Sequence, residues 1–359
     1  MDIFSELASL SRAASVRGRE SGTVELLKRR WGPWLDDVRT GRLGNFVGLR
    51  RGTGPEPRPK VMAAAHMDGV GLVVTRVEGG GFLRVTSVGG IDRRLLLGQE
   101  VQVQGRRPLT GVIGARPPHL SSPEERTGTV PLEELYVDTG LAESEVKELV
   151  PPGSPVLYRQ DLVLLRNGRA AGRCLDDAVG LVVLGVALEE LARVEHQADF
   201  YVVGTVGEEA GRYPGAVTAA YDLWPQIAFA VDVTFGSYPG QNDPTGTYPL
   251  GGGPAIGVGP NCHPKLVALL EEQATEAGIP FSREVMPGAT GTDAWGIQVV
   301  RGAIPTAVLS VPLRYMHTPV ETVSLDDIAS TGKLLARAVA RVDRPAVEGL
   351  SCYEDKPRT

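Results

Sequence analysis

Short, mainly apolar runs of strand length recur along this chain, separated by segments with helical periodicity. The most prominent runs are residues 61–65, 200–206, 227–231 and 307–311. Runs this short without an alternating polar face are typical of strands buried in a parallel sheet. Helical patterns at residues 1–36, 177–191 and 264–277 lie before and between these runs. The alternation predicts an α/β fold with helices packed on the sheet.

A β-rich segment interrupts this alternation. Short segments at residues 72–77, 82–88 and 100–104 alternate with glycine turns, and helical periodicity is nearly absent until residues 143–149. A chain of 359 residues also exceeds what one hydrophobic core usually serves. We therefore expect an inserted small β-barrel or β-sandwich at residues 70–164. The two parts of one α/β domain, residues 1–69 and 165–359, would flank it.

Two local patterns give expectations about single residues. Ser324 followed by Asp327 has the spacing of a capping box, and it begins a closing helix whose buried face carries Ile328 and Leu335. His196 lies in a charged segment, and we expect it on the solvated surface.

The composition excludes several classes of function. The net charge is −6 and the chain has no Lys/Arg run, so nothing neutralises a nucleic-acid backbone or an anionic membrane. The first residues lack the basic flank and apolar core of a signal peptide, and the longest uncharged stretch, residues 244–264, has too much Gly and Pro to span a bilayer. Three scattered cysteines argue against a disulfide framework. We expect a cytoplasmic protein without nucleic-acid or membrane partners.

Residues of the types that bind metals follow several of the predicted strands or begin the helices after them. They are His66, Asp176, Glu209, Asp232 and His317. In open α/β sheets, functional groups gather just beyond the carboxyl ends of the strands, so these side chains would point into one crevice. Their separations of 110, 33, 23 and 85 residues match no local zinc-finger spacing. The fold, and not a short loop, would therefore assemble the site.

Each of these residues has a simpler interpretation when taken alone. His66 could be a hydrogen-bonded loop histidine, Asp176 a helix N-cap, and Asp232 the first residue of a turn. Glu208 and Glu209 fit a simple interpretation less well, because adjacent carboxylates at the end of a buried strand repel each other unless a cation or a proton compensates them. The set as a whole favours a metal site.

Five segments of the chain resemble, in order and spacing, the dinuclear-metal aminopeptidases of metallopeptidase family 42. The segments are Ala65–Gly71, Leu175–Asp177, Thr205–Glu209, Asp232–Thr234 and Arg314–Glu321. Further similar landmarks are Gly44–Asn45, Gly111–Gly114, Pro117–His119 and Gly291–Ala294. The family contains glutamyl and deblocking aminopeptidases, including tetrahedral, self-compartmentalising ones. The role of His119, in the third landmark, stays open.

The resemblance implies a role for each residue of the predicted site. Asp176 would bridge two divalent ions, zinc or cobalt, with His66 and Asp232 on one ion and Glu209 and His317 on the other. Glu208 would act as general base in removing N-terminal residues from short peptides. Asp68 would orient the imidazole of a ligand histidine.

The resemblance also implies an architecture. It predicts a phosphorylase/hydrolase-like α/β/α catalytic domain around the inserted β domain. In the family that insertion often mediates oligomers, so we expect a homo-oligomer between a dimer and a dodecamer.

Three positions depart from the family pattern. Gly69 stands where family members commonly have Glu, Ala178 where they have Arg, and Phe235 where they have His. These departures affect the substrate pocket and its surroundings, and they are the support for a non-catalytic member of the same fold. A second alternative is a glycoside hydrolase that uses Glu208 and Asp68 as its two carboxylates, which would leave both predicted histidine ligands without a role.

Overall fold

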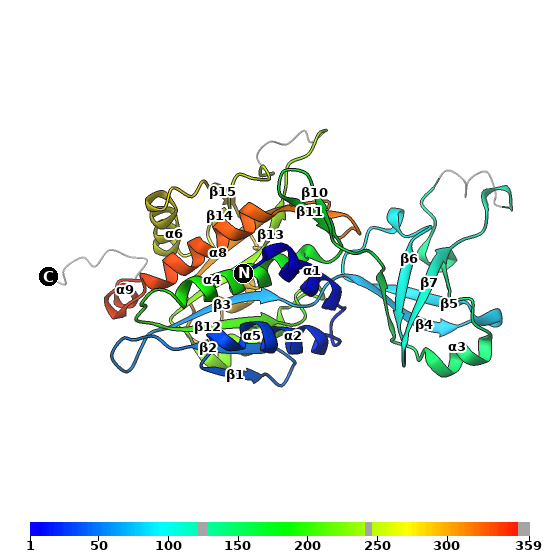
Figure 1. Ribbon diagram of the computed structural model, residues 1–359, viewed down its shortest axis with the longest axis horizontal. Coiled ribbons are helices and arrows are strands. Elements are labelled where there is room, and N and C mark those ends of the chain that lie inside the picture. The colour runs from blue at the N-terminus through cyan, green and yellow to red at the C-terminus, as the bar shows by residue number, and fades with distance from the viewer. Residues whose placement is uncertain (121–127, 241–245, 351–359) are drawn as a thin grey trace.

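A computed structural model describes residues 1–120, 128–240 and 246–350 of the chain (Figure 1). A body of helices packed on a large sheet forms one end of the elongated molecule, and a β-barrel forms the other. Within the described residues, no helix is both long and apolar enough to cross a membrane.

The large sheet has four parallel strands at its centre. Its main path runs β1 (Asp37–Thr40), β2 (Phe46–Arg50), β12 (Asp199–Thr205), β3 (Lys60–His66), β13 (Ile227–Phe235), β16 (Thr306–Arg314), β17 (Glu321–Ser324), β11 (Arg169–Gly172) and β10 (Val163–Leu165). Two further strands, β14 (Ala255–Val258) and β15 (Ser282–Val285), pair with each other, and β14 also pairs with β16. Strands β12, β3, β13 and β16 are parallel neighbours. They match the four apolar runs expected to be strands, apart from Val206, which follows the end of β12.

Helices cover both faces of this sheet. One face packs against α1 (Ile3–Ala13), α2 (Ser21–Trp31), α4 (Leu175–Leu191), α6 (Pro264–Glu276) and α8 (Leu325–Ala340). The other face packs against α5 (Pro214–Leu223) and α7 (Ala294–Ile297). In β3, Val61, Ala63 and Ala65 belong to the first core, and Met62 and Ala64 to the second. A strand buried on both faces has no polar face, which explains its continuous apolar run.

The inserted segment forms a closed barrel. Its strands run in the order β4 (Gly71–Val77), β5 (Leu83–Val88), β8 (Tyr136–Asp138), β7 (Pro108–Gly114), β6 (Glu100–Gln104) and β9 (Pro155–Tyr158). The barrel has its own apolar core, which includes Leu72, Val103 and Val146 of α3 (Glu143–Leu149). Closure removes the exposed strand edges that a small sheet would otherwise present. Of the two expected forms of the insertion, the barrel is the one found.

The expected capping box of α8 is wrong. The Ser324 side chain makes no capping hydrogen bond. The Asp327 carboxylate instead accepts from the main-chain N–H of Gly251 at 2.7 Å and of Gly253 at 2.8 Å, so it holds a distant loop. The predicted apolar face is confirmed, since Ile328 and Leu335 are fully buried. A short helix, α9 (Arg344–Glu348), follows α8.

The expectation for His196 is also wrong. Its side chain is 3% exposed, because the segment after α4 packs under the loop at residues 52–54. The carbonyl of His196 accepts from the main-chain N–H of Thr53 at 2.8 Å. A charged neighbourhood in sequence did not reveal this burial, because the covering loop lies more than a hundred residues away.

Candidate metal centre

The central strands bring the predicted site residues to one edge of the sheet. His66 ends β3 and pairs in register with Thr205, the last residue of β12. Glu208 and Glu209 follow three and four residues after Thr205, and Asp232 lies near the end of the neighbouring strand β13. His317 lies in the connection between β16 and β17. The carboxyl ends of parallel strands meet at this edge, which is where α/β sheets carry their functional groups.

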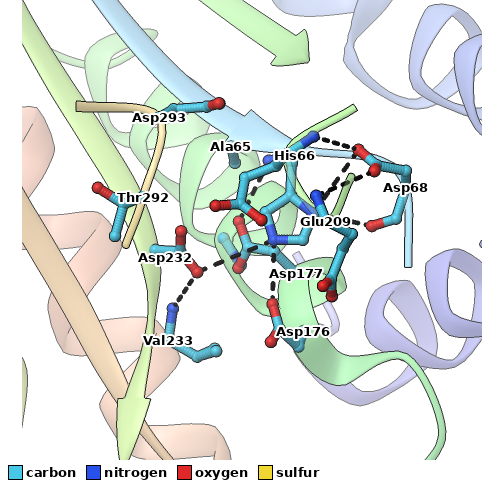
Figure 2. A network of polar contacts seen from close by, with 12 residues as sticks. Ala65, His66, Asp68, Asp176, Asp177, Glu209, Asp232, Val233, Thr292 and Asp293 are labelled. Carbon is cyan, nitrogen blue, oxygen red and sulfur yellow. Dashed lines mark hydrogen bonds and ion pairs between the residues drawn. The ribbon is translucent and has the colours of Figure 1, made fainter. Parts of the chain in front are cut away.

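Asp176 lies between two groups of side chains, one on each carboxylate oxygen. Its Oδ1 is 3.0 Å from Nε2 of His66, which in turn lies 3.9 Å from Oδ1 of Asp232. Its Oδ2 is 3.3 Å from Nε2 of His317, which lies 3.3 Å from Oε1 of Glu209. Figure 2 shows the imidazole of His66 with dashed contacts to Asp176 and Asp232. All five predicted ligands thus lie in one cluster.

Both histidines present the same ring nitrogen to this cluster. Nδ1 of His66 donates to the main-chain carbonyl of Asp68 at 2.8 Å, and Nδ1 of His317 donates to that of Gly90 at 3.1 Å. A carbonyl oxygen can only accept, so the proton stays on Nδ1 and the lone pair of Nε2 can face a cation. Gly90 belongs to the barrel insertion, which therefore helps to orient one predicted ligand.

The side chains present fit divalent cations. Two sets, His66 with Asp176 and Glu209, and His66 with Asp177 and Asp232, each have potential ligand atoms within 4.8 Å of one another. Oε1 of Glu209 is buried without a hydrogen bond among the described residues. Atoms bound to one tetrahedral zinc ion at about 2.0–2.2 Å lie roughly 3.4 Å apart, close to several contacts of this cluster. Imidazoles with carboxylates are a typical ligand set for zinc-like ions.

The electrostatics of the cluster also call for positive charge. Burial opposes protonation of His317, yet its close contacts with the carboxylates of Asp176 and Glu209 raise the pKa of its imidazole to about 11. Burial opposes ionisation of Asp176, yet hydrogen bonds to His317 and His66 hold its pKa below the ordinary value. Burial, with Asp177 nearby, raises the pKa of Asp232 well above its ordinary value. Buried carboxylates of this kind need protons or cations as compensation.

Asp68 holds the loop that carries the two glutamates. Its carboxylate is 1% exposed and accepts main-chain N–H groups from Gly207 at 2.7 Å, from Glu208 at 3.2 Å and from Glu209 at 3.3 Å. The His66 ring contacts the carbonyl of Asp68, while the carboxylate oxygen stays 4.0 Å from Nδ1. Asp68 therefore contacts the ring through its main chain and fixes the glutamate loop through its side chain.

The structure adds Asp177 as a residue that supports the cluster. Oδ1 of Asp177 accepts the N–H of Gly180 at 2.8 Å, and Oδ2 accepts the N–H of His66 at 3.3 Å. Asp177, and not Asp176, thus provides the side-chain cap at the start of α4. The Asp176 side chain is left to face the two histidines.

Glu321 is a second supporting residue, which the sequence signalled only as the end of a matching segment. Its fully buried carboxylate accepts main-chain N–H groups from Leu175 at 2.5 Å, Asp176 at 3.3 Å and His317 at 2.7 Å. His317 has a left-handed backbone with φ of 63°, uncommon for a residue with a side chain, and this hydrogen bond helps to hold it.

Glu208 lines a cavity of about 350 Å³ that also touches Asp176, Glu209, Asp232 and His317. Burial, together with nearby Asp293, Glu209 and Asp176, raises the pKa of Glu208 to about 8. Asp293 is fully buried, and burial raises its pKa to about 6 against a hydrogen bond from Thr205 Oγ1 at 2.5 Å. No sequence signal pointed to Asp293 specifically.

The remaining positions singled out from the sequence lie in varied surroundings. His119 is exposed in a 3₁₀ turn of the barrel insertion and is not one of the clustered side chains. Ala178 is buried in α4, and a side chain at Gly69 would meet Sγ of Cys174 at 3.2 Å. Phe235 lines the cavity with its ring largely exposed.

Comparison with known proteins places the chain in a family. Residues 44–334 match the M42 glutamyl aminopeptidase family. The chain belongs to this family. Lysyl aminopeptidase from Pyrococcus furiosus is 37% identical over 86% of this chain and 88% of its own. Aminopeptidase APDkam598 from Desulfurococcus kamchatkensis superposes with a TM-score of 0.90 at 33% identity, covering 99% of each chain.

A third relative is known in an assembled form. The TET1 peptidase of Pyrococcus horikoshii superposes with a TM-score of 0.83 at 31% identity, over 95% of this chain and all of its own, and it can assemble into a tetrahedron or a large octahedral shell. These matches confirm the expected family and the α/β fold with its barrel insertion. The protein is a hydrolase of the aminopeptidase type, from a family of metallopeptidases.

Proposed function

We propose that this M42 family protein removes N-terminal residues from short peptides at a centre of two divalent metal ions. The observation that carries the proposal is the position of Asp176, whose two carboxylate oxygens face two separate pairs of side chains. A carboxylate placed in this way can bridge two ions. We assign His66 and Asp232 to one ion, and Glu209 and His317 to the other.

Zinc or cobalt suits this ligand set of two imidazoles and three carboxylates. When bound, the two ions would acidify a water molecule, polarise the scissile carbonyl and hold the free amine of the peptide. The protein holds the predicted ligand residues in place through hydrogen bonds from other parts of the chain. The carbonyls of Asp68 and Gly90 orient the imidazoles, and Glu321 fixes the main chain at Asp176 and His317.

Glu208 is the general base in this proposal. It lines the same cavity as the ligands, and no hydrogen bond or ion pair ties its carboxylate to another described residue. Its main chain is fixed by the Asp68 carboxylate. A carboxylate in this position can accept a proton from the attacking water and pass it to the leaving amine. Surrounding acids and burial raise its pKa, which favours holding that proton between the two steps.

The geometry of Asp68 disfavours the glycoside hydrolase alternative. A carboxylate that cleaves a sugar bond must face the substrate. The Asp68 carboxylate is buried and already accepts three main-chain N–H groups. The non-catalytic alternative gains no support from the ligand cluster, because none of Gly69, Ala178 and Phe235 belongs to it.

We further propose a homo-oligomer that works in the cytoplasm. The support for assembly is the P. horikoshii relative, which forms closed shells and covers nearly the whole chain. Cys174 and Cys262 are buried free thiols, which suits a reducing compartment. Light scattering on the purified protein measures the oligomer directly, and a monomer at micromolar concentration would contradict this part of the proposal.

Turnover by metal-reconstituted protein tests the function. Protein stripped with a chelator is reloaded with zinc or cobalt and given aminoacyl p-nitroanilides, their N-acetylated counterparts and a β-1,4-glucan. We expect metal-dependent release of p-nitroaniline from the free-amine substrates only. Hydrolysis of the glucan, or equal turnover of acetylated substrates, would contradict an aminopeptidase. Failure to release p-nitroaniline with either metal would favour the non-catalytic alternative.

A further inference from the structure

One carboxylate in the cavity beside the candidate metal centre is not one of the predicted ligands. Glu284 belongs to β15, at the edge of the sheet, and it lines the same cavity of about 350 Å³ as Glu208 and Asp232. Neither set of clustered ligand atoms includes it. The substrate side of the cavity therefore carries a negative group that the proposed reaction does not use.

A threonine holds this carboxylate beside the cluster. Oγ1 of Thr234 donates to Oε1 of Glu284 at 2.5 Å. Thr234 follows Asp232 by two residues on β13, so both side chains point to the same side of the strand, about 7 Å apart along it. Glu284 is thus held by a residue that lies two positions after a predicted metal ligand on β13.

The second oxygen of Glu284 has no hydrogen-bond donor in good geometry, although the hydroxyl of Ser310 lies near the carboxylate. Oε2 is buried and makes no hydrogen bond among the described residues. Burial raises the pKa of Glu284, and the hydroxyls of Thr234 and Ser310 are the groups that oppose the rise. No Lys, Arg or His in the described part of the chain forms an ion pair with it. A buried acceptor without a hydrogen bond, on a residue that lines a cavity, can be satisfied by a donor that arrives with a ligand.

Apolar side chains also line this cavity. Phe235, Met286 and Met316 line the cavity together with Glu284. The Phe235 side chain is 58% exposed, so its ring is available to a ligand. An aliphatic chain that ends in a cation would pack its carbons on these side chains and bring its charge to Glu284. Lysine and arginine have that form.

We propose that Glu284 is a specificity-determining residue that selects peptides with a basic N-terminal residue, lysine or arginine. The inference rests on the proposed aminopeptidase function, which places the N-terminal residue at the metal centre. The carboxylate would form a charge-assisted hydrogen bond with the side-chain cation, while the apolar side chains contact its stem. Acidic N-terminal residues would be repelled by the same group.

Kinetics with matched variants test this assignment. Wild type, Glu284→Gln and Glu284→Asp are assayed on the p-nitroanilides of lysine, arginine, leucine and glutamate, with Glu272→Gln on the exposed side of α6 as control. We expect wild type and Glu272→Gln to prefer lysine and arginine. Glu284→Gln should lose about 10- to 100-fold in kcat/KM on these two substrates, mainly through KM, with leucine nearly unchanged. Glu284→Asp, which keeps the charge, should keep part of the preference.

Equal losses on lysine and leucine would mean that Glu284 has only a structural role and would overturn the inference. So would a wild type that prefers leucine or glutamate. Circular dichroism of each variant shows whether it is folded, and Glu284→Asp provides a second comparison if the glutamine variant is not.

Calorimetry separates this inference from the proposed function. Free L-lysine and L-norleucine differ in the terminal amine, and their binding to the metal-loaded protein does not require turnover. We expect wild type to bind lysine at least about 10-fold more tightly than norleucine, and Glu284→Gln to bind both equally. Absence of turnover with this preference intact would contradict the aminopeptidase proposal alone. Turnover without any preference for lysine would contradict the role of Glu284 alone.

Discussion

The main-chain N–H of His317 donates to Oε1 of Glu321 at 2.7 Å, and through this bond a buried carboxylate fixes a predicted metal ligand. The other oxygen of Glu321 accepts the N–H of Asp176 at 3.3 Å. One side chain thus ties together two parts of the chain that lie 141 residues apart and that both enter the candidate metal centre. Hydrogen bonds of this kind orient metal-binding residues, in addition to the bonds that these residues make to the metal itself.

Replacement of Glu321 by glutamine should weaken metal binding more than it weakens the fold. An amide nitrogen cannot accept an N–H, so either Asp176 or His317 would lose its support. We expect about a 10- to 100-fold loss of metal affinity, as is typical when a group that orients a ligand is removed. Titration with zinc, monitored by calorimetry on protein that circular dichroism shows to be folded, measures it. Unchanged affinity with a lowered melting temperature would mean a purely structural role.

Glu208→Gln should separate catalysis from metal binding. Glutamine keeps the size of the side chain but accepts no proton, so turnover should fall by roughly 10²- to 10⁴-fold. Metal content should stay near two ions per chain. Elemental analysis beside the p-nitroanilide assay measures both quantities.

Glu209→Gln provides the matched comparison with Glu208→Gln, because it makes the same chemical change at a predicted metal ligand. A neutral amide binds divalent cations poorly, so this variant should lose metal from one of the two sites. Equal metal loss in both variants would show that the roles of Glu208 and Glu209 are wrongly assigned. Small and similar effects of both on turnover would point to an ordinary acidic pair.

Removal of the metal should abolish turnover and leave most of the secondary structure intact. The predicted ligands lie on separate elements, and each element is held by a large apolar core on the sheet. Far-UV circular dichroism before and after chelation tests this. A loss of the helical signal together with activity would mean that the metal holds the fold.

His196 should make stability depend on pH in the mildly acidic range. Burial is the main cause that lowers the pKa of its imidazole below the ordinary 6.5. The unfolded chain then binds the proton more readily than the folded one, so stability is fully present above pH 6.5 and falls as the pH drops below it. Urea unfolding of wild type and His196→Gln between pH 5 and 8 isolates the effect. We expect a shallower dependence in the variant, and identical slopes would contradict this origin.

Much of the fold was predictable because burial leaves a local pattern. The runs at residues 61–65 and 227–231 are apolar throughout because helices cover both faces of their strands. After residue 70, short β-rich segments replace the helical periodicity. These segments are strands that bury one face in a barrel core, as the alternating burial of β7 shows. Periodicity of this kind is a property of neighbouring residues and can be read without tertiary contacts.

Local spacing failed where a side chain has a choice of partners. Asp327 has the position of a capping residue, but it binds the N–H groups of Gly251 and Gly253, which are more than seventy residues away. At the start of α4, two adjacent aspartates could each act as the cap, and Asp177 takes that role. A sequence shows that an acceptor is present, and only the folded chain shows which donor reaches it.

Several central strands and helices, a β-rich segment between them, the family, and the residue types at the ends of the strands could all be predicted from the order of the amino acids. Three findings needed the folded chain: the carboxylate of Asp68 holds the glutamate loop, Glu321 supports two predicted ligands, and Glu284 lines the cavity. The physical reason is that each of these contacts joins residues 50 or more positions apart in the chain or depends on which atom of a side chain points inward. Hydrophobic periodicity records whether a residue is buried, and it holds no information about which distant hydrogen-bonding group meets it there.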